Sequence, residues 1–244
     1  MSKPCEVFYK VLGPRGEAVN GGHGQWPLPH GSRPGKWIEV TGPLRACQNG
    51  LHVCRLEQLV DWLGSTIWRV EIQGERIEQS DKIVARQGRL LSRCEGWTDK
   101  SARLFAVACA RRALERERKA GREPDTRSWN ALTVATAYAN GLATDEQLII
   151  AGAAAGDATW AVAEAAGGAA WAATWDAVEA ATWDAAKAAE AATEAAVGTA
   201  VGDATWAAVG TATEAATGAA WAAAWTAERQ WQLTELKKVL EGRS

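Results

Sequence analysis

Residues 168–175 read Gly-Ala-Ala-Trp-Ala-Ala-Thr-Trp, and residues 218–225 repeat the motif as Gly-Ala-Ala-Trp-Ala-Ala-Ala-Trp. Alanine has the highest helix propensity, so the surrounding segment 151–227 is predicted to be helical. Isolated helices are marginal in water and alanine buries little area, so the tryptophans must supply the apolar surface, about 150–250 Å² each. Two tryptophans four residues apart lie on one helix face. The motif therefore predicts helices that pack through tryptophan.

A second repeated phrase, Asp-Ala-Thr-Trp, occurs at 157–160 and 203–206, which indicates a duplicated helical hairpin. If the tryptophans form a core, Trp171→Ala or Trp221→Ala is expected to cost about 3–5 kcal/mol of stability. Two alternatives stay open. The tryptophans could form an exposed groove for a partner helix, or the Ala/Thr helices could bind ice, although the threonines lack a sustained eleven-residue repeat.

Length and charge limit the class of protein. The chain has 244 residues and a net charge of −2, which excludes a uniformly basic nucleic-acid binder, so nucleic acid is not an expected partner. The uncharged stretch 215–227 is shorter than the roughly 20 residues of a membrane span, so no membrane association is expected. Five cysteines without a Cys-x-x-Cys pair, and no apolar signal core at the N-terminus, predict a cytoplasmic protein.

The first 95 residues differ in pattern from the rest. Segments 6–12, 36–40, 67–73 and 82–93 are rich in β-branched or alternating apolar residues and predict strands, and apolar residues at helical spacing in 56–63 predict a short helix. The predicted fold class is therefore α+β. A small mixed α/β domain (1–95) is followed by an Ala/Trp-rich all-α bundle (96–244) with a possible duplicated hairpin.

Local signals set helix ends in the second domain. Thr98 or Asp99 is a helix N-cap, Asn140-Gly141 is a typical helix stop, and Thr144 with Gln147 forms a capping box. A basic run is expected to be a solvated helix face on which Glu115 and Glu117 pair at helical spacing. Its members are Arg111, Arg112, Arg116, Arg118, Lys119 and Arg122.

The densest polar cluster is Cys47-Gln-Asn-Gly-Leu-His52-Val-Cys54. Buried structural cysteines with a hydrogen-bonded histidine are one interpretation of it. A zinc site completed by Cys5 or Cys94 is a second, although the spacing fits no familiar zinc motif, so no metal is predicted. A Cys–His nucleophile pair is a third, but no third orienting residue is evident.

A Gly/Pro-rich loop, 20–35, carries His23, Trp26 and His30. Its glycines match no phosphate-binding loop. The loop is either structural or the lip of a ligand site, since loops on rigid scaffolds often carry function.

Two resemblances add to these patterns. The stretch from Tyr9-Lys-Val-Leu to Asn49-Gly-Leu-His-Val-Cys54, with the strand Val70-Glu-Ile-Gln-Gly74, resembles an uncharacterised domain of phage and bacterial proteins. Residues 101–150, with Arg103-Leu-Phe-Ala-Val-Ala-Cys-Ala-Arg111 and Ala139-Asn-Gly-Leu-Ala-Thr-Asp-Glu146, resemble a family of immunity proteins of bacterial toxin systems. The resemblances imply a protein of a bacterial or phage-infected cell.

The leading functional hypothesis is a non-enzymatic interaction factor, immunity-like or a phage accessory or anti-defence protein, whose helical domain binds a protein partner. The alternative is an N-terminal nucleotide-binding or ADP-ribosyltransferase-like module, because strands with Tyr9, His52 and Glu71 follow a similar order in that fold. No catalytic residue and no cofactor are predicted, and the oligomeric state, a homo-oligomer included, stays open. The candidate binding residues are Tyr9, His23, Trp26, His52, Cys54 and Glu71.

Overall fold

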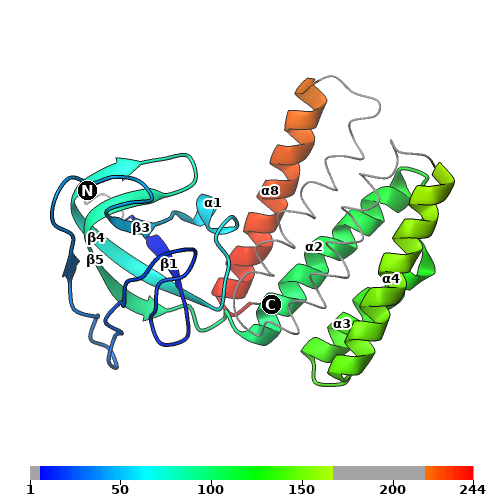
Figure 1. Ribbon diagram of the computed structural model, residues 1–244, viewed down its shortest axis with the longest axis horizontal. Helices are drawn as coiled ribbons and strands as arrows, with labels where there is room; N and C mark the ends of the chain where they lie inside the picture. Colours follow the sequence, from blue (N-terminus) through cyan, green and yellow to red (C-terminus); the bar gives the residue numbers. More distant parts are fainter. Residues whose placement is uncertain (1–5, 167–217, 244) are drawn as a thin grey trace. The chain divides into compact units, whose positions relative to one another are not determined.

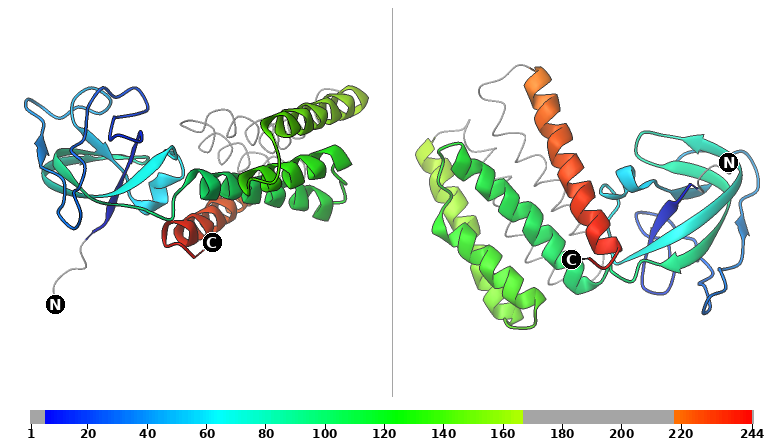
Figure 2. Two further views of the ribbon diagram at one scale, coloured as in Figure 1. Left: turned by 90° about the horizontal axis from the view of Figure 1, so that it is seen from below. Right: turned by 180° about the vertical axis from the view of Figure 1, so that it is seen from behind.

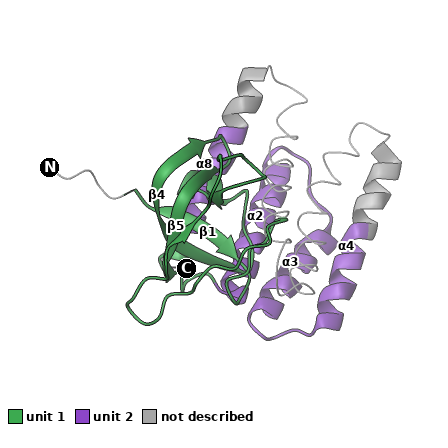
Figure 3. Ribbon diagram, turned by 60° about the vertical axis from the view of Figure 1, so that its left-hand side comes forward, with its two compact units in different colours: residues 1–97, 240–242 green, residues 98–239, 243–244 purple. Residues whose placement is uncertain are grey.

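The computed structural model describes residues 6–166 and 218–243, and side chains for 6–156 and 225–243 (Figure 1). The chain divides into two compact units, which are residues 1–97 with 240–242 and residues 98–239 with 243–244 (Figure 3). Each unit is described by itself below.

The first unit is an antiparallel sheet. Its strands are β1 (Phe8–Leu12), β2 (Ile38–Glu39), β3 (Leu51–Val53), β4 (Thr66–Glu78) and β5 (Ile83–Arg93), and its helix is α1 (Leu56–Leu59). The long hairpin of β4 and β5 forms the body of the sheet (Figure 2). β1 pairs with the free edge of β4, while β2 and β3 both pair with β5.

The sheet closes on itself through its two short strands. Tyr9 and Cys54 exchange backbone hydrogen bonds of 2.8 and 2.9 Å, so the strand path β1–β4–β5–β3 returns to β1. Two register shifts in the β4–β5 ladder, one beside Gly74 with its φ of 76°, add the twist that closure needs. The enclosed core consists of Phe8, Leu12, Trp26, Val53, Trp68, Val70, Ile83 and Leu90.

The predicted fold class is therefore wrong for the first domain, which is a five-stranded antiparallel sheet and not a mixed α/β domain. The apolar spacing in 56–63 yields a helix of only four residues. Parallel pairing needs crossovers of a dozen or more residues, usually helical, whereas β4 and β5 are joined by a four-residue turn that permits only antiparallel pairing.

The second unit contains the helices α2 (Asp99–Lys119), α3 (Thr126–Ala139), α4 (Asp145–Ala166) and α8 (Gly218–Leu240). The predicted helix ends are confirmed. Thr98 is the N-cap of α2, Gly141 follows α3 with a φ of 72°, and Thr144 and Gln147 exchange the two hydrogen bonds of a capping box. α2 lies between α3 and α8 (Figures 1 and 2).

The described core of this unit is made of small and medium aliphatic side chains. Its members are Val107, Ala110, Leu114, Ala131, Leu132, Ala135, Leu148, Ala151 and Ala155, with Trp129, Val134 and Tyr138 at its border. The elements described in this unit are all helices, as predicted, but the predicted duplicated hairpin falls mostly outside the described residues. Most of the repeat, 167–217 with Trp171, lies outside the described residues, as does the side chain of Trp221.

The basic run is exposed, as predicted, at Arg111, Arg118, Lys119 and Arg122, but Arg112 and Arg116 depart from the predicted solvated face. Arg112 Nε and Arg116 Nη2 lie 2.8 and 2.9 Å from the carboxylate of Glu228 in α8, a residue only 1% exposed. The guanidinium of Arg112 also stacks on the ring of Trp231, 4.6 Å from its centre. Two arginines of the run therefore hold α8 against α2.

Among the described residues, no helix has both the length and the apolar character needed to cross a membrane.

Candidate functional site

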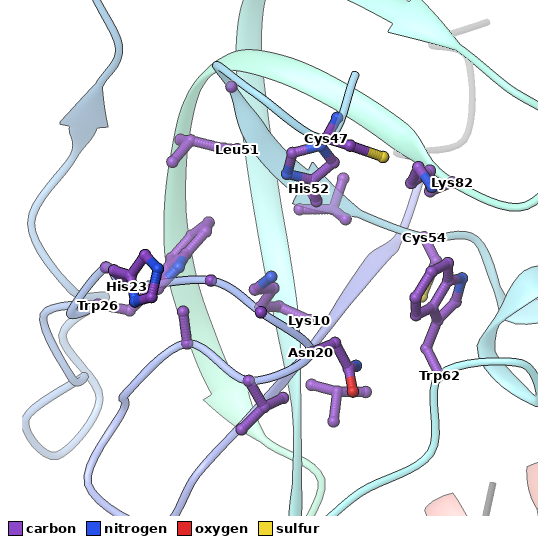
Figure 4. Close-up of a pocket in the computed structure, with 18 of the residues that line it drawn as sticks. Lys10, Asn20, His23, Trp26, Cys47, Leu51, His52, Cys54, Trp62 and Lys82 are labelled. Carbon is purple, nitrogen blue, oxygen red and sulfur yellow. The ribbon is translucent and has the colours of Figure 1, made fainter. Parts of the chain in front are cut away.

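A cavity of about 600 Å³ opens in the first unit beside the seam between β1 and β3 (Figure 4). Its walls come from β1, the loop 18–26, the segment 47–54, Trp62 and Lys82. This volume is within the range of small-molecule sites. Five of the six predicted binding residues line it, namely Tyr9, His23, Trp26, His52 and Cys54.

Trp26 is placed in the cavity wall by the irregular hairpin that follows β1. The backbone N–H of Trp26 donates to the carbonyl of Gly16 at 2.8 Å, and the residue is only 4% exposed. The ring lies across Gly88 of β5, where a Cβ would come within 3.2 Å of it. Gly88 therefore makes the room in which Trp26 packs. His23, on the same loop, is exposed.

His52 is fixed by the turn that precedes β3. The N–H of Cys47, a residue in the left-handed region with a φ of 61°, donates to His52 Nε2 at 3.0 Å. Partial burial, and then the charges of Lys10 and Lys82, lower the pKa of His52 below its ordinary value. His52 is therefore neutral at pH 7, and because Nε2 accepts a hydrogen bond, Nδ1 carries the proton.

Cys54 does not provide a nucleophile. Burial raises the pKa of its thiol to about 12, and Sγ lies 3.6 Å from the carbonyl oxygen of Tyr9, to which the thiol donates. At neutral pH this cysteine is a thiol, whereas nucleophilic attack requires the thiolate. Burial likewise raises the pKa of Tyr9, so its phenol stays protonated. Within the described ranges no cluster of three or more His, Cys, Asp or Glu could hold a metal ion.

Lys82 and Trp62 lie on the side of the cavity away from Trp26 and His23 (Figure 4). The ammonium of Lys82 lies 5.0 Å from the centre of the Trp62 ring and 2.9 Å from the carboxylate of Asp81. The indole N–H of Trp62 donates to the backbone carbonyl of Asp81 at 2.7 Å. Lys82 lines the cavity, whereas Asp81, its partner in this ion pair, does not.

The residue that sequence reasoning missed is Lys10. Successive side chains of a strand point to opposite faces, so in β1 Lys10 lies on the same face as Phe8 and Leu12. Phe8 and Leu12 belong to the enclosed core. Its cross-strand partner is Trp68, also a core residue. The ammonium lies 5.9 Å from the centre of the Trp26 ring, and Figure 4 shows Lys10 near the middle of the labelled side chains.

Glu71, the sixth predicted residue, is not in the cavity. It pairs across the β4–β5 ladder with Arg89, whose Nη2 lies 2.6 Å from the carboxylate. Arg89 in turn stacks on Trp37, 4.7 Å from the ring centre. Glu71 therefore contributes to the outer surface of the hairpin, and within the described part of the chain no Asp or Glu lines the cavity.

Comparisons of the chain with protein-family models, with curated proteins and with solved structures give no match.

Proposed function

We propose that the sheet unit binds a small anionic molecule with a planar aromatic group, of the size of a mononucleotide, in the cavity beside Lys10. This proposal keeps the nucleotide-binding alternative of the sequence analysis but rests on Lys10 and Lys82 in place of Tyr9 and Glu71. Lys10 and Lys82 supply the positive charge, and Trp62 and His52 supply the aromatic surfaces.

The observation that carries the proposal is the uncompensated charge of Lys10. Buried or partly buried ammonium groups normally have an ion-pair or hydrogen-bond partner, because desolvation is costly. Among the residues that the structure describes, the ammonium of Lys10 has no carboxylate or hydrogen-bond acceptor, only the face of Trp26. An anionic ligand would supply the missing counter-charge.

The lining explains why the ligand should be aromatic as well as anionic. Among the residues that the structure describes, no Asp or Glu lines the cavity, and the neighbouring carboxylate of Asp81 is paired with Lys82. The partly exposed ring of Trp62 and the neutral imidazole of His52 offer stacking surfaces, which are worth about 1–3 kcal/mol per base in nucleic-acid sites. A cavity of about 600 Å³ has room for one nucleotide.

The test is calorimetric titration of the full chain with AMP, cyclic AMP and NAD, beside adenosine as the uncharged comparison. We expect saturable binding of at least one anion, at least tenfold tighter than adenosine, and a tenfold or greater loss of affinity in Lys10→Met. Lys36→Met removes an exposed lysine of the same unit outside the cavity and should leave affinity unchanged. Equal affinity in all three proteins would refute the proposal.

The second candidate function is that the helical unit binds a protein partner, of the kind that the resemblance to immunity proteins implies. The supporting observation is a group of large apolar side chains on the surface near the start of α4. Leu142, Ile149 and Ile150 are 80%, 49% and 61% exposed. Such groups often mark interaction sites.

This candidate is tested by affinity capture from host lysate with the parent chain and with an Ile149→Asn/Ile150→Asn variant. A stoichiometric partner that the parent retains and the variant loses would support the candidate. Thr133→Asn, at an exposed position of α3, is the control for surface substitution. A partner retained equally by the parent and both variants would place the interaction elsewhere.

A further inference from the structure

The environment of Lys10 favours chemical reactivity of its amine in addition to the binding of an anion. Its side chain is partly buried, on the inward face of β1, between Trp26 of the loop and Trp68 of β4. The cavity gives a small molecule access to it (Figure 4). Lys82, which is paired with Asp81 at 2.9 Å, lies in the part of the wall away from Trp26 (Figure 4) and provides a second cation for the anionic end of the same molecule.

We propose that Lys10 forms an imine with an aldehyde or ketone that carries an anionic group, the anion being held on the side of Lys82. The inference rests on the proposed ligand cavity, and it adds a covalent step and a class of ligand, the anionic carbonyl compounds.

Desolvation supports this role. Burial lowers the pKa of Lys10 to about 8. At pH 7 an amine with this pKa is neutral in about one molecule in ten, whereas an ordinary lysine is neutral in about one in 2,500. Only the neutral amine has the lone pair that attacks a carbonyl carbon, and desolvation in an apolar pocket is an established way to activate a lysine.

The step is balanced without an oxidant or a reductant. The ammonium of Lys10 first loses one proton to solvent. Its nitrogen then bonds to the carbonyl carbon as the carbon–oxygen π bond breaks. The two remaining protons of the amine move to the oxygen, which leaves as water, and a carbon–nitrogen double bond remains. The reaction reverses by addition of water, so the ligand is held covalently but not permanently.

The test uses pyridoxal 5′-phosphate as the probe, because it combines an aldehyde, an aromatic ring and a phosphate. The full chain is incubated with the probe at pH 7, the imine is trapped with borohydride, and the modified lysines are identified by peptide mass spectrometry. We expect Lys10 to be modified at least ten times faster than the exposed Lys36 of the same molecule. Lys10→Arg keeps the charge and should abolish the fast phase, and Lys82→Gln should slow it.

Modification of Lys10 no faster than that of Lys36 would overturn the inference, and this comparison is internal to the parent protein. Pyridoxine 5′-phosphate, which has an alcohol in place of the aldehyde, separates this failure from a failure of the cavity proposal. If this analogue and the nucleotides bind but Lys10 is not preferentially trapped, the cavity binds anions without imine chemistry. If neither they nor the aldehyde probe bind, both proposals fail.

Discussion

The uncompensated ammonium of Lys10 should make the stability of the sheet unit depend on pH in a specific direction. Burial lowers the pKa of Lys10 from 10.5 to about 8. The unfolded chain therefore binds more protons than the folded chain between these two values, and stability rises with pH in that window. At about 1.36 kcal/mol per pKa unit, the shift corresponds to about 3 kcal/mol of folding stability. The charged Lys10 lowers the free energy of unfolding by this amount below pH 8, and the loss disappears by about pH 10.5.

The perturbation is Lys10→Met, which has a side chain of similar length and no charge. The free energy of unfolding of parent and variant is measured by urea titration at several pH values between 7 and 10.5. Subtracting one curve from the other removes the titration of all groups that the two proteins share. We expect the variant to be more stable by up to about 3 kcal/mol at pH 7, with the two proteins converging as pH rises toward 10.5.

Parallel curves over the whole range would refute the reasoning, since they would mean that Lys10 titrates alike in the folded and unfolded chains. The same titration in the presence of a bound nucleotide provides a second check. A bound anion favours the charged form of Lys10 and raises its pKa. Anion binding should therefore weaken as pH rises through about 8 in the parent, and this dependence should be absent in Lys10→Met.

Three further predictions concern the scaffold. Glu228→Ala leaves Arg112 and Arg116 without their shared carboxylate and should cost about 3–5 kcal/mol of stability in thermal melts, whereas Glu235→Gln, in a half-exposed pair, should cost under about 1 kcal/mol. Gly50→Ala should destabilise by about 1–3 kcal/mol or more in urea titration, because Gly50 has a φ of 148° and its Cβ would collide with Val84. Among the four described cysteines, exposed Cys47 should react first with iodoacetamide, as read by peptide mass spectrometry. The first prediction is contradicted if the two glutamate variants lose equal stability. The second is contradicted if Gly50→Ala leaves the free energy of unfolding unchanged, and the third if a buried cysteine is labelled faster than Cys47.

The helix ends could be predicted because they depend on neighbours in sequence. Thr98 accepts from the backbone N–H of Ser101, three residues later, and Thr144 and Gln147 satisfy each other in the same way. These hydrogen bonds satisfy N–H groups in the first turn of a helix, which have no acceptor within the helix. A short stretch of sequence therefore determines them.

The sheet could not be predicted to the same degree because its strands pair over long separations. β1 pairs with β4, about 58 residues away, and β3 closes the circuit through Tyr9 and Cys54. Strand existence followed from β-branched and aromatic residues in segment 6–12 and from alternation in segment 67–73, but neither pattern says which strands meet. The true length of β4, Thr66–Glu78, depends on a bulge beside Gly74 that allows a polar stretch to continue the ladder.

The buried ion pair in the helical unit was missed for a related reason. In sequence Glu228 lies in α8 and its partners lie in α2, more than a hundred residues earlier. Local spacing favoured Glu115 and Glu117 as partners of the basic run. Helical spacing counts only neighbours along one helix, so it cannot detect a carboxylate that a second helix brings into the same place.

The candidate site shows what alternation alone could have decided. In β4, Trp68, Val70 and Ile72 pack on the enclosed core, so Glu71 had to face outward, where it pairs with Arg89. In β1, Phe8 and Leu12 pack on the same core, so Lys10 had to face inward. The period of two that predicted the strands therefore excludes Glu71 from the cavity and places Lys10 in it. The exchange replaces a carboxylate by a desolvated amine. It thereby moves the proposed chemistry of the site away from the ADP-ribosyltransferase-like alternative, toward the proposed recognition of an anion and, through the neutral amine, of a carbonyl.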